Sequence, residues 1–525
     1  MDNQSLFAGI DVSTQGCKLL ILDSNKEKVV YIDSINYDQD LPHFHTQNGT
    51  LTGLKEGCSE SDPHMWIEAI KVLFEGLKKS RLHQDKIRCI SVSGQQHGLV
   101  SLDSQGKLTR KTSKLWNDFS TTEECELLTQ FVGGKEAMIK EVGNSQKTGY
   151  TAPKILHMLR NEPENYQKTD IFLVVHNYIN WFLTGGVKVM EPGDTSGTAL
   201  WNPESKKWSK RVIQAIDPTL QGKLPSVKSS RRTIGLISSS LVENYGFSPK
   251  CKIDAGSGDN MYGAVGTGNI DPGILSISLG TSGTAFTILK KPYIDPSGEI
   301  ACYCDSTGNY LPLLCVSNLS NGYNNLLKKH QISHQEFTQI THQTKPGNLG
   351  RILIPWYTGE RTPDLPLASP LYFGFKLDDF NQNTLCRAVL EGHILNLYQG
   401  YKRMPVKTKQ IRLTGGLSQS DAWRQAIADI FEAETIPVLG EGAALGAAIH
   451  AAWAWGLEAG IHRTLQELTS TFVKLDHKAK KLPDPSATPI YRIQKRLYHA
   501  LVHRIQGKKG EDPFVLQHKL KSKST

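Results

Sequence analysis

One carboxylate in the sequence has the setting expected of a general base. Asp259 and Asn260 follow the run Gly256-Ser257-Gly258, at the end of a short strand predicted over residues 252–254. Glycines let a loop pass close to a ligand, and in phosphoryl transfer one carboxylate accepts the proton of the acceptor alcohol. We expect Asp259 to be this base and Asn260 to hold a neighbouring hydroxyl, although an Asx turn would use the same residue types.

Two distant segments share a plan that suits phosphate binding. Residues 6–23 and 274–289 each contain an apolar strand, a turn rich in glycine, serine and threonine, and a second alternating strand. This is the pattern of a β-hairpin whose turn presents backbone N–H groups to anions. In the first turn we expect Asp11 to hold Mg²⁺ through water and Thr14 to hydrogen-bond the nucleotide. Asp11 capping its own backbone is the alternative.

The second turn, Gly280-Thr281-Ser282, is predicted to cradle the β- and γ-phosphates of a nucleotide. It is not a Walker A loop, because the G-x-x-x-x-G-K-[ST] pattern is absent and a strand follows instead of a helix. An ordinary tight hairpin is the alternative. Further along, Gly415, Gly416 and Ser420 follow a predicted strand at 410–413, where adenine and ribose would lie against the backbone.

A third group of residues suits a polyhydroxylated ligand. Gln96 and His97 come directly after the predicted strand 87–92, and Trp116 and Asp118 add an aromatic face and a polar group. Sugar hydroxyls require such donors and acceptors in fixed positions. A histidine satisfied within the core is the alternative for His97.

Strands and helices alternate along the chain, which is typical of an α/β protein. Each half opens with a glycine-rich hairpin and later has a strand that ends in a glycine loop, so we predict a duplicated domain. A chain of 525 residues exceeds one core. We place an N-terminal domain at residues 1–262, a C-terminal domain at 263–460, and a helical extension with a basic tail at 461–525.

Composition excludes several other classes. No run reaches the length of a membrane span, and no cysteine or histidine cluster has zinc spacing. Nine scattered cysteines indicate free thiols and a cytoplasmic protein. The net charge of +9 is concentrated late in the chain, where we expect a solvated or frayed tail. We therefore expect no membrane or nucleic-acid partner. The sequence leaves open whether the chain forms a homodimer.

The motifs taken together resemble the FGGY carbohydrate kinases over residues 6–460. The matching pieces are GIDVSTQGCK from Gly9, SGQQHG from Ser93, LWND from Leu115, TGYTAPK from Thr148, EPGDTSGT from Glu191, GSGDN from Gly256, SLGTSGT from Ser278, GERTP from Gly359, TGGLSQSDAWRQ from Thr414 and EGAALGAA from Glu441. Within the family the chain most resembles the members that act on D-xylulose. Two departures are Ser420, where many relatives have Asn, and Phe119-Ser120, where bacterial members have Gly-Arg.

The resemblance implies two ribonuclease H-like domains of the actin/hexokinase type with an interdomain cleft. It also implies transfer of phosphate from ATP, with Mg²⁺, to the 5-hydroxyl of D-xylulose. Asp259 would be the base and Asp11 would act near the metal. Gln96, His97 and Asn260 would contact the sugar. The residues that would line the nucleotide site are Gly280, Thr281, Gly415, Gly416 and Ser420. Two alternatives stay open: a sister kinase acting on ribulose, sedoheptulose or glycerol, and an actin-like ATPase switch.

Overall fold

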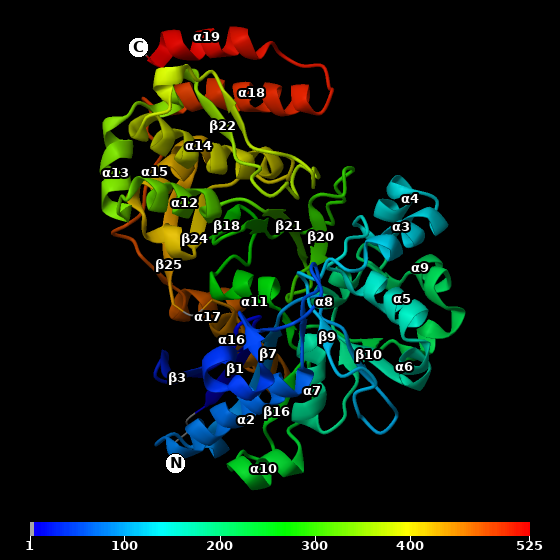
Figure 1. Cartoon of the computed structure of the whole chain (residues 1–525). Helices are drawn as coiled ribbons and strands as arrows, with labels where there is room; N and C mark the ends of the chain where they lie inside the picture. Colours follow the sequence, from blue (N-terminus) through cyan, green and yellow to red (C-terminus); the bar gives the residue numbers. More distant parts are fainter. Residues whose placement is uncertain (1–4, 441, 525) are drawn as a thin grey trace. The chain divides into compact units, whose positions relative to one another are not determined.

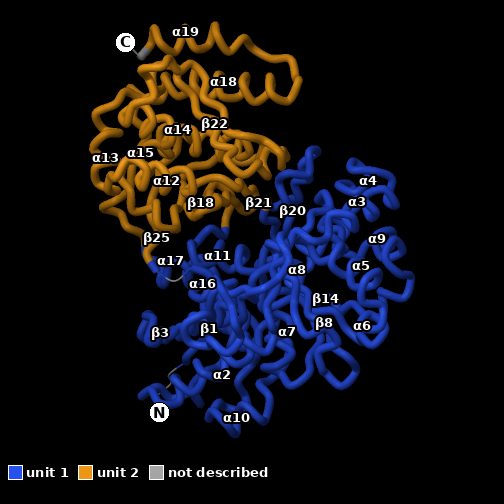
Figure 2. Tube along the Cα trace, viewed as in Figure 1, with its two compact units in different colours: residues 1–270, 289–311, 440–474 blue, residues 271–288, 312–439, 475–525 orange. Residues whose placement is uncertain are grey.

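The structure is a computed structural model that describes residues 5–440 and 442–524. The chain forms two compact units (Figure 2). Unit 1 comprises residues 1–270, 289–311 and 440–474, and unit 2 comprises residues 271–288, 312–439 and 475–525. The division predicted from the sequence, with boundaries at 262 and 460, stays a prediction. Glu441, the first residue of the last family motif, lies outside the described residues.

Unit 1 is built on a mixed sheet with the strand order β15-β16-β7-β1-β2-β3, and β17 also pairs with β7. The strands β1, β2 and β3 form an antiparallel meander, whereas β7 runs parallel to β1, and β16 and β17 run parallel to β7. Their bounds are β1 Leu6–Val12, β2 Gly16–Asp23, β3 Lys28–Asn36, β7 Ile87–Gly94, β15 Thr233–Leu236, β16 Lys252–Asp254 and β17 Ser257–Gly258. The hairpin predicted over residues 6–23 is therefore confirmed.

Helices cover both faces of this sheet (Figure 1). Side chains alternate along a strand, and Leu6, Ala8 and Ile10 of β1 share a core cluster with α2 (Pro63–Lys79). On the other face α16 (Gly442–Ala459) crosses β1 at Gly9, where a Cβ would lie 2.1 Å from the Ala444 carbonyl oxygen. The sheet is thus buried on both faces, as its continuous apolar strands predict.

A second cluster in unit 1 is formed mainly by helices between the main-sheet strands β7 and β15. Strand β10 (Ile171–Leu173) pairs antiparallel with β8 (Val100–Leu102) in a separate two-stranded sheet. The helices of this region are α3 Thr122–Phe131, α4 Lys135–Val142, α5 Thr151–Asn161, α6 Pro163–Lys168, α7 Val175–Thr184, α8 Pro192–Thr195, α9 Lys210–Ile216 and α10 Ser239–Tyr245.

Unit 2 repeats the sheet of unit 1. Its strands follow the order β21-β19-β18-β24-β25, in which the first three are antiparallel and β24 and β25 run parallel to β18. This matches β3-β2-β1-β7-β16 in both order and direction, so the predicted duplication and the α/β fold class are confirmed. The bounds are β18 Ile274–Leu279, β19 Gly283–Thr287, β21 Tyr310–Val316, β24 Gln410–Thr414 and β25 Glu434–Leu439.

In unit 2, α14 and α15 pack against strands of this sheet, whereas α18 and α19 pack against helices (Figure 1). Strand β22 is short (Ile352–Ile354) and is followed at once by Pro355, which has no N–H for a ladder. The helices are α12 Ser320–His330, α13 His334–Gln343, α14 Gln382–Tyr401, α15 Asp421–Phe431, α18 Thr488–Ile505 and α19 Pro513–Ser524.

The basic C-terminal tail is helical, where we expected a solvated or frayed segment. Helix α19 buries Leu516 and Leu520, which are four residues apart and therefore on one face. Its Gln517 also donates a hydrogen bond to the Gly350 carbonyl. Three lysines of the tail, Lys519, Lys521 and Lys523, therefore lie on a helix that is held by its apolar side.

Candidate active site

The parallel strands of unit 1 bring the predicted base and sugar residues to one edge. In the ladder, Asp11 of β1 is level with Ser93 of β7, and Gly258 of β17 is level with Gly94. Segments that follow the carboxyl ends of neighbouring parallel strands meet at the same edge of a sheet, which is where α/β proteins bind ligands. Asp11, the segment 95–97 and the segment 259–260 therefore gather at this edge.

Asp259 is the first residue of α11 (Asp259–Gly266) and is half-buried. Its Oδ1 accepts hydrogen bonds from the backbone N–H of Asn260 at 2.8 Å and from Asn260 Nδ2 at 3.0 Å. Desolvation, reinforced by the negative charges of Asp11 and Asp194, raises the pKa of Asp259 to about 7. A carboxylate with this pKa can accept a proton near neutral pH far better than an ordinary aspartate.

Asn260 connects the base to the predicted sugar residues. Its Nδ2 also donates to Gln96 Oε1 at 2.9 Å. Gln96 is buried, and its Nε2 has no hydrogen-bond partner within the described chain. Buried amide groups are rarely left unsatisfied, so this nitrogen is suited to a ligand hydroxyl. A Cβ on Gly258 would lie 2.7 Å from Gln96 Cγ, which explains why glycine precedes the base.

His97 lies in a strained backbone position with φ of 68°. Its carbonyl oxygen accepts a hydrogen bond from Lys154 Nζ at 2.8 Å. Its ring packs against Tyr150, with the ring centroids 4.8 Å apart, and Nε2 lies 3.4 Å from the Tyr303 hydroxyl. The histidine therefore contacts groups from two other segments of unit 1: the start of α5, with Tyr150 just before it, and β20 (Ala301–Cys304).

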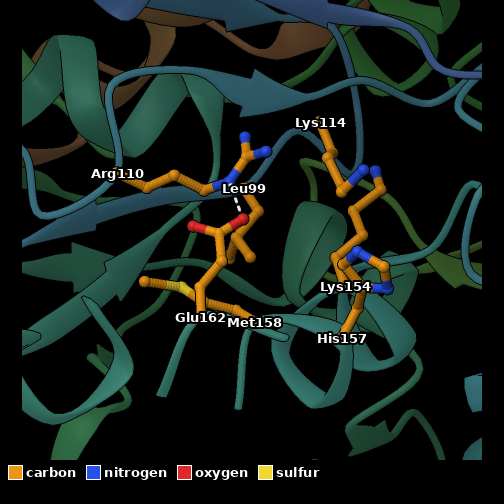
Figure 3. A pocket seen from close by; sticks show the side chains of 7 residues that line it. All are labelled: Leu99, Arg110, Lys114, Lys154, His157, Met158 and Glu162. Atoms are coloured by element: carbon orange, nitrogen blue, oxygen red, sulfur yellow. Dashed lines mark hydrogen bonds and ion pairs between the residues drawn. The ribbon is translucent and has the colours of Figure 1, made fainter. Parts of the chain in front are cut away.

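Lys154, which donates to the His97 carbonyl, lines a small pocket (Figure 3). Lys154 is buried in it and also donates to the Gly149 carbonyl at 2.8 Å. Burial lowers the pKa of Lys154 to about 7. Arg110 bridges Glu60 and Glu162 beside it. The pocket is lined by Leu99, Arg110, Lys114, Lys154, His157, Met158 and Glu162. Its basic side chains are paired with carboxylates such as Glu60 and Asp118 or with backbone carbonyls, so the pocket supports the loop.

Trp116 and Asp118 behave differently from each other. Trp116 Nε1 donates to Thr14 Oγ1 at 3.0 Å, and Thr14 in turn donates to Gln95, so the indole joins the first hairpin turn to the segment after β7. Asp118 is fully buried and accepts hydrogen bonds from Ser59, Ser120 and Lys114. The structure therefore does not bring Asp118 into the hydrogen-bonded group around Asp259, and its sugar contact stays a prediction.

Asp11 is half-buried, and its Oδ1 accepts from Ser93 Oγ at 2.7 Å. Desolvation raises its pKa, against the opposing effects of Ser93 and Lys18. Among the described residues there is no group of three or more His, Cys, Asp or Glu side chains that could hold a metal. Magnesium keeps several waters and binds through one or two carboxylates, so a single aspartate fits a water-mediated role.

The predicted nucleotide residues other than Thr14, which is in unit 1, lie in unit 2. The register of β18 and β24 pairs Ser278 with Thr414, so the turn after each strand lies at the same edge. Gly415 has φ of 83°, and a Cβ there would lie 2.6 Å from the Leu279 carbonyl oxygen. The half-exposed Gly280 and the exposed Thr281 directly follow Leu279, the last residue of β18, and so lie next to this loop. Ser420 precedes α15, and its Oγ is buried without a hydrogen-bond partner in the described chain.

Sequence reasoning missed four residues of this arrangement: Ser93, Lys154, Asp194 and Tyr303. Three of them stand inside motifs that carried the resemblance, where nothing in the local pattern indicates what they contact. The fourth, Tyr303, lies between Cys302 and Cys304 on a buried strand, far in sequence from His97. Only the fold brings these side chains to the site.

Three further observations concern the whole chain. All nine cysteines lie in the described part and are free. None of the helices described has both the length and the apolar character needed to cross a membrane. The family models for the FGGY family of carbohydrate kinases match twice, the N-terminal domain at residues 6–266 and the C-terminal domain at residues 275–455.

Individual proteins agree with this match. A xylulose kinase from Haemophilus influenzae is 34% identical over 498 residues, covering 93% of this chain and 97% of its own length. A xylulose kinase from Mus musculus is 29% identical and covers 95% of this chain and 94% of its own. The crystal structure of a ligand-bound xylulose kinase from Lactobacillus acidophilus, at 24% identity, superposes with a TM-score of 0.85 over 96% of this chain and 98% of that one, which shows a shared fold.

Proposed function

Because the chain belongs to the FGGY family of carbohydrate kinases, we propose that it transfers the γ-phosphate of ATP to the 5-hydroxyl of D-xylulose. The products are D-xylulose 5-phosphate and ADP. The choice of sugar is supported by the names of the relatives that match nearly the whole chain. The choice of base is supported by one observation above all: Asp259, with a pKa of about 7, is hydrogen-bonded through Asn260 to the buried amide of Gln96.

In the proposed reaction the 5-hydroxyl gives its proton to Asp259. The alcohol oxygen then forms a bond to the γ-phosphorus as the bond to the β-γ bridging oxygen breaks, and ADP leaves. Asn260, Gln96 and His97 hold neighbouring hydroxyls so that the reacting oxygen is oriented before transfer. Positioning of this kind supplies much of the rate acceleration in phosphoryl transfer.

The nucleotide is proposed to bind to unit 2. Backbone groups and hydroxyls of Gly280, Thr281 and Ser282 hold phosphate oxygens, while Gly415 and Gly416 leave room for adenine and ribose. A Cβ on Gly416 would meet no atom within 4 Å, so this glycine borders open space suited to a flat ring. The buried, unpaired hydroxyl of Ser420 supports a hydrogen bond to the same ligand.

Magnesium, when bound, would neutralise charge on the phosphates. Asp11 is proposed to hold it through water, because its carboxylate is half-buried and fixed by Ser93 at the strand edge that also carries the base. Thr14 is held between Trp116 and Gln95, so the turn that follows Asp11 is tied to the sugar segment.

A sister kinase acting on another ketose or polyol is the second candidate, because pocket details decide such choices. The test is a coupled ADP-release assay with D-xylulose, D-ribulose, sedoheptulose, glycerol and no sugar. We expect a response to D-xylulose at least a hundredfold above the other acceptors, with phosphate on oxygen 5 by phosphorus NMR of the product. A larger response to another acceptor would replace D-xylulose, and ADP release without any acceptor would point to an ATPase switch.

A further inference from the structure

The turn proposed to bind phosphate is held by hydrogen bonds from the start of α12. The backbone N–H of Leu319 donates to the Thr281 carbonyl at 3.1 Å, and the N–H of Ser320 donates to the Gly280 carbonyl at 3.2 Å. These two bonds fix the direction of the peptide groups in the turn. Whatever positions residues 317–320 therefore also positions the turn.

Glu360 holds the residues immediately before α12. It is 3% exposed, and Oε1 accepts from the backbone N–H of Ser317 at 2.5 Å. Its Oε2 accepts from Asn318 Nδ2 at 3.3 Å, and the same Asn318 amide donates to the Gly359 carbonyl at 2.7 Å. A buried carboxylate needs several donors to stay charged, so Glu360 and residues 317–318 constrain one another.

Asn396 of α14 connects Glu360 to the C-terminal helices. Its Nδ2 donates to Glu360 Oε2 at 2.8 Å. Its Oδ1 accepts from Trp356 Nε1 at 3.0 Å and from the hydroxyl of Tyr498 at 3.2 Å. Asn396 is fully buried, and Trp356 and Tyr498 are each 1% exposed, so water cannot replace these bonds.

Tyr498 lies on α18, outside the residues 275–455 that the family's C-terminal domain model matches. We propose that Tyr498 and Asn396 are positioning residues for the nucleotide: through Glu360 and the start of α12, helix α18 sets the Gly280-Thr281 turn. The connection is Tyr498 to Asn396, Asn396 to Glu360, Glu360 to Ser317 and Asn318, and then Leu319 and Ser320 to the turn. Only its link to nucleotide binding rests on the function proposed above.

Helix α18 also provides a matched control. Tyr491 is two turns earlier, is equally buried, and donates its hydroxyl to Glu391 Oε1 at 3.0 Å. Glu391 accepts in turn from the N–H of Gly347 and from Gln494. The Tyr491 hydroxyl also accepts from Arg387, which bonds on to Thr341 and Thr344, so this network runs to residues 341–347. Tyr491→Phe therefore removes a buried hydroxyl from the same helix without touching the route to the turn.

The experiment compares the full-length wild type, Tyr498→Phe and Tyr491→Phe. Hydrogen exchange of the ligand-free proteins reports the N–H groups of Leu319 and Ser320. We expect Tyr498→Phe to speed their exchange at least fivefold and Tyr491→Phe to change it less than twofold. Equal changes in the two variants would overturn the proposal, because they would show a general loosening of α18.

Calorimetric titration with ADP tests the link to the nucleotide. We expect Tyr498→Phe to raise the dissociation constant for ADP three- to tenfold and Tyr491→Phe to leave it within twofold of the wild type. The KM for the sugar should be unchanged in both variants. If Tyr498→Phe speeds the exchange of the Leu319 and Ser320 N–H groups but leaves the affinity for ADP unchanged, the positioning role of Tyr498 for the nucleotide is overturned. Failure of the wild type to bind ADP would instead overturn the proposed function, while the exchange result would still decide whether α18 sets the turn. Glu360→Gln, which replaces an accepting oxygen by a donor, is a second variant expected to exceed Tyr498→Phe in both readouts.

Discussion

At Asp259 two opposing effects set the chemistry. Desolvation, together with the charges of Asp11 and Asp194, raises the pKa of the carboxyl group, and two hydrogen bonds from Asn260 lower it. The first effect dominates and places the pKa at about 7. The same bonds fix the orientation of the carboxylate, so the residue gains basicity without losing its position.

The pH dependence of catalysis follows from this pKa. A general base must be deprotonated, so we expect kcat/KM for D-xylulose to fall about tenfold per pH unit below pH 7. An aspartate at its ordinary pKa near 4 would keep the rate constant down to about pH 5. A profile from pH 5 to 9 in saturating ATP distinguishes the two, and a flat rate between pH 5 and 7 would show that the carboxyl is not perturbed as described.

Lys154 is the residue that most directly fixes the backbone of His97. Replacing it with methionine keeps the length of the side chain and removes the hydrogen bonds to the carbonyls of His97 and Gly149. We expect the KM for D-xylulose to rise about tenfold, which corresponds to the loss of one or two buried hydrogen bonds. The KM for ATP serves as the control, and an equal rise in both constants would indicate a general loss of structure.

The elements were the part of the structure that the sequence predicted best. Both hairpins and the strand before Asp259 follow from the apolar patterns of the sequence. The same reasoning placed Asp259, Asn260 and Gln96 at strand ends, where parallel pairing brings them together. It failed for Lys154 and Tyr303, because which buried side chain meets His97 depends on packing between segments that no local pattern specifies.

Packing between α11 and α16 gives a prediction at this scale. A Cβ on Gly446 of α16 would lie 1.9 Å from the carbonyl oxygen of Tyr262 in α11. We expect Gly446→Ala to lower the free energy of unfolding by about 1 to 3 kcal/mol, since neither backbone can move without disturbing the sheet. Because α11 begins with Asp259, kcat should fall as well.

The control for this substitution is Gly222→Ala, at a position where an added Cβ meets no atom within 4 Å and φ is not positive. Urea unfolding of both variants is the measurement. A change below about 0.5 kcal/mol is expected for Gly222→Ala. The same small change for Gly446→Ala would mean that the two helices are not packed as closely as described.

At the scale of the whole molecule, one sheet design is used twice, and we propose that each copy binds a different ligand. In unit 1 the strand edge carries carboxylates and amides suited to a sugar, and in unit 2 the corresponding edge carries glycines and hydroxyls suited to phosphate. The duplication supplies the frame, and the residues after each strand supply the chemistry. This is why motif spacing predicted the function class, whereas the hydrogen-bonded support behind each loop became visible only in three dimensions.

The proposed division, with the sugar on unit 1 and the nucleotide on unit 2, predicts which Michaelis constant each variant changes. His97→Asn in unit 1 should raise the KM for D-xylulose at least tenfold and leave the KM for ATP within twofold. Gly415→Ala in unit 2 combines an unfavourable φ of 83° with a contact of 2.6 Å to the Leu279 carbonyl, so it should raise the KM for ATP and spare the sugar. Steady-state kinetics with each substrate varied in turn decides the question, and crossed effects would contradict the proposed division.

The most direct test of the central claim is the turnover of Asp259→Asn with saturating D-xylulose and ATP. This substitution keeps the shape of the side chain and removes its ability to accept the hydroxyl proton. The account predicts a fall in kcat of at least a thousandfold, with ADP still binding within twofold of the wild-type affinity. A kcat within tenfold of the wild type would contradict it, because the carboxylate could not then be the base.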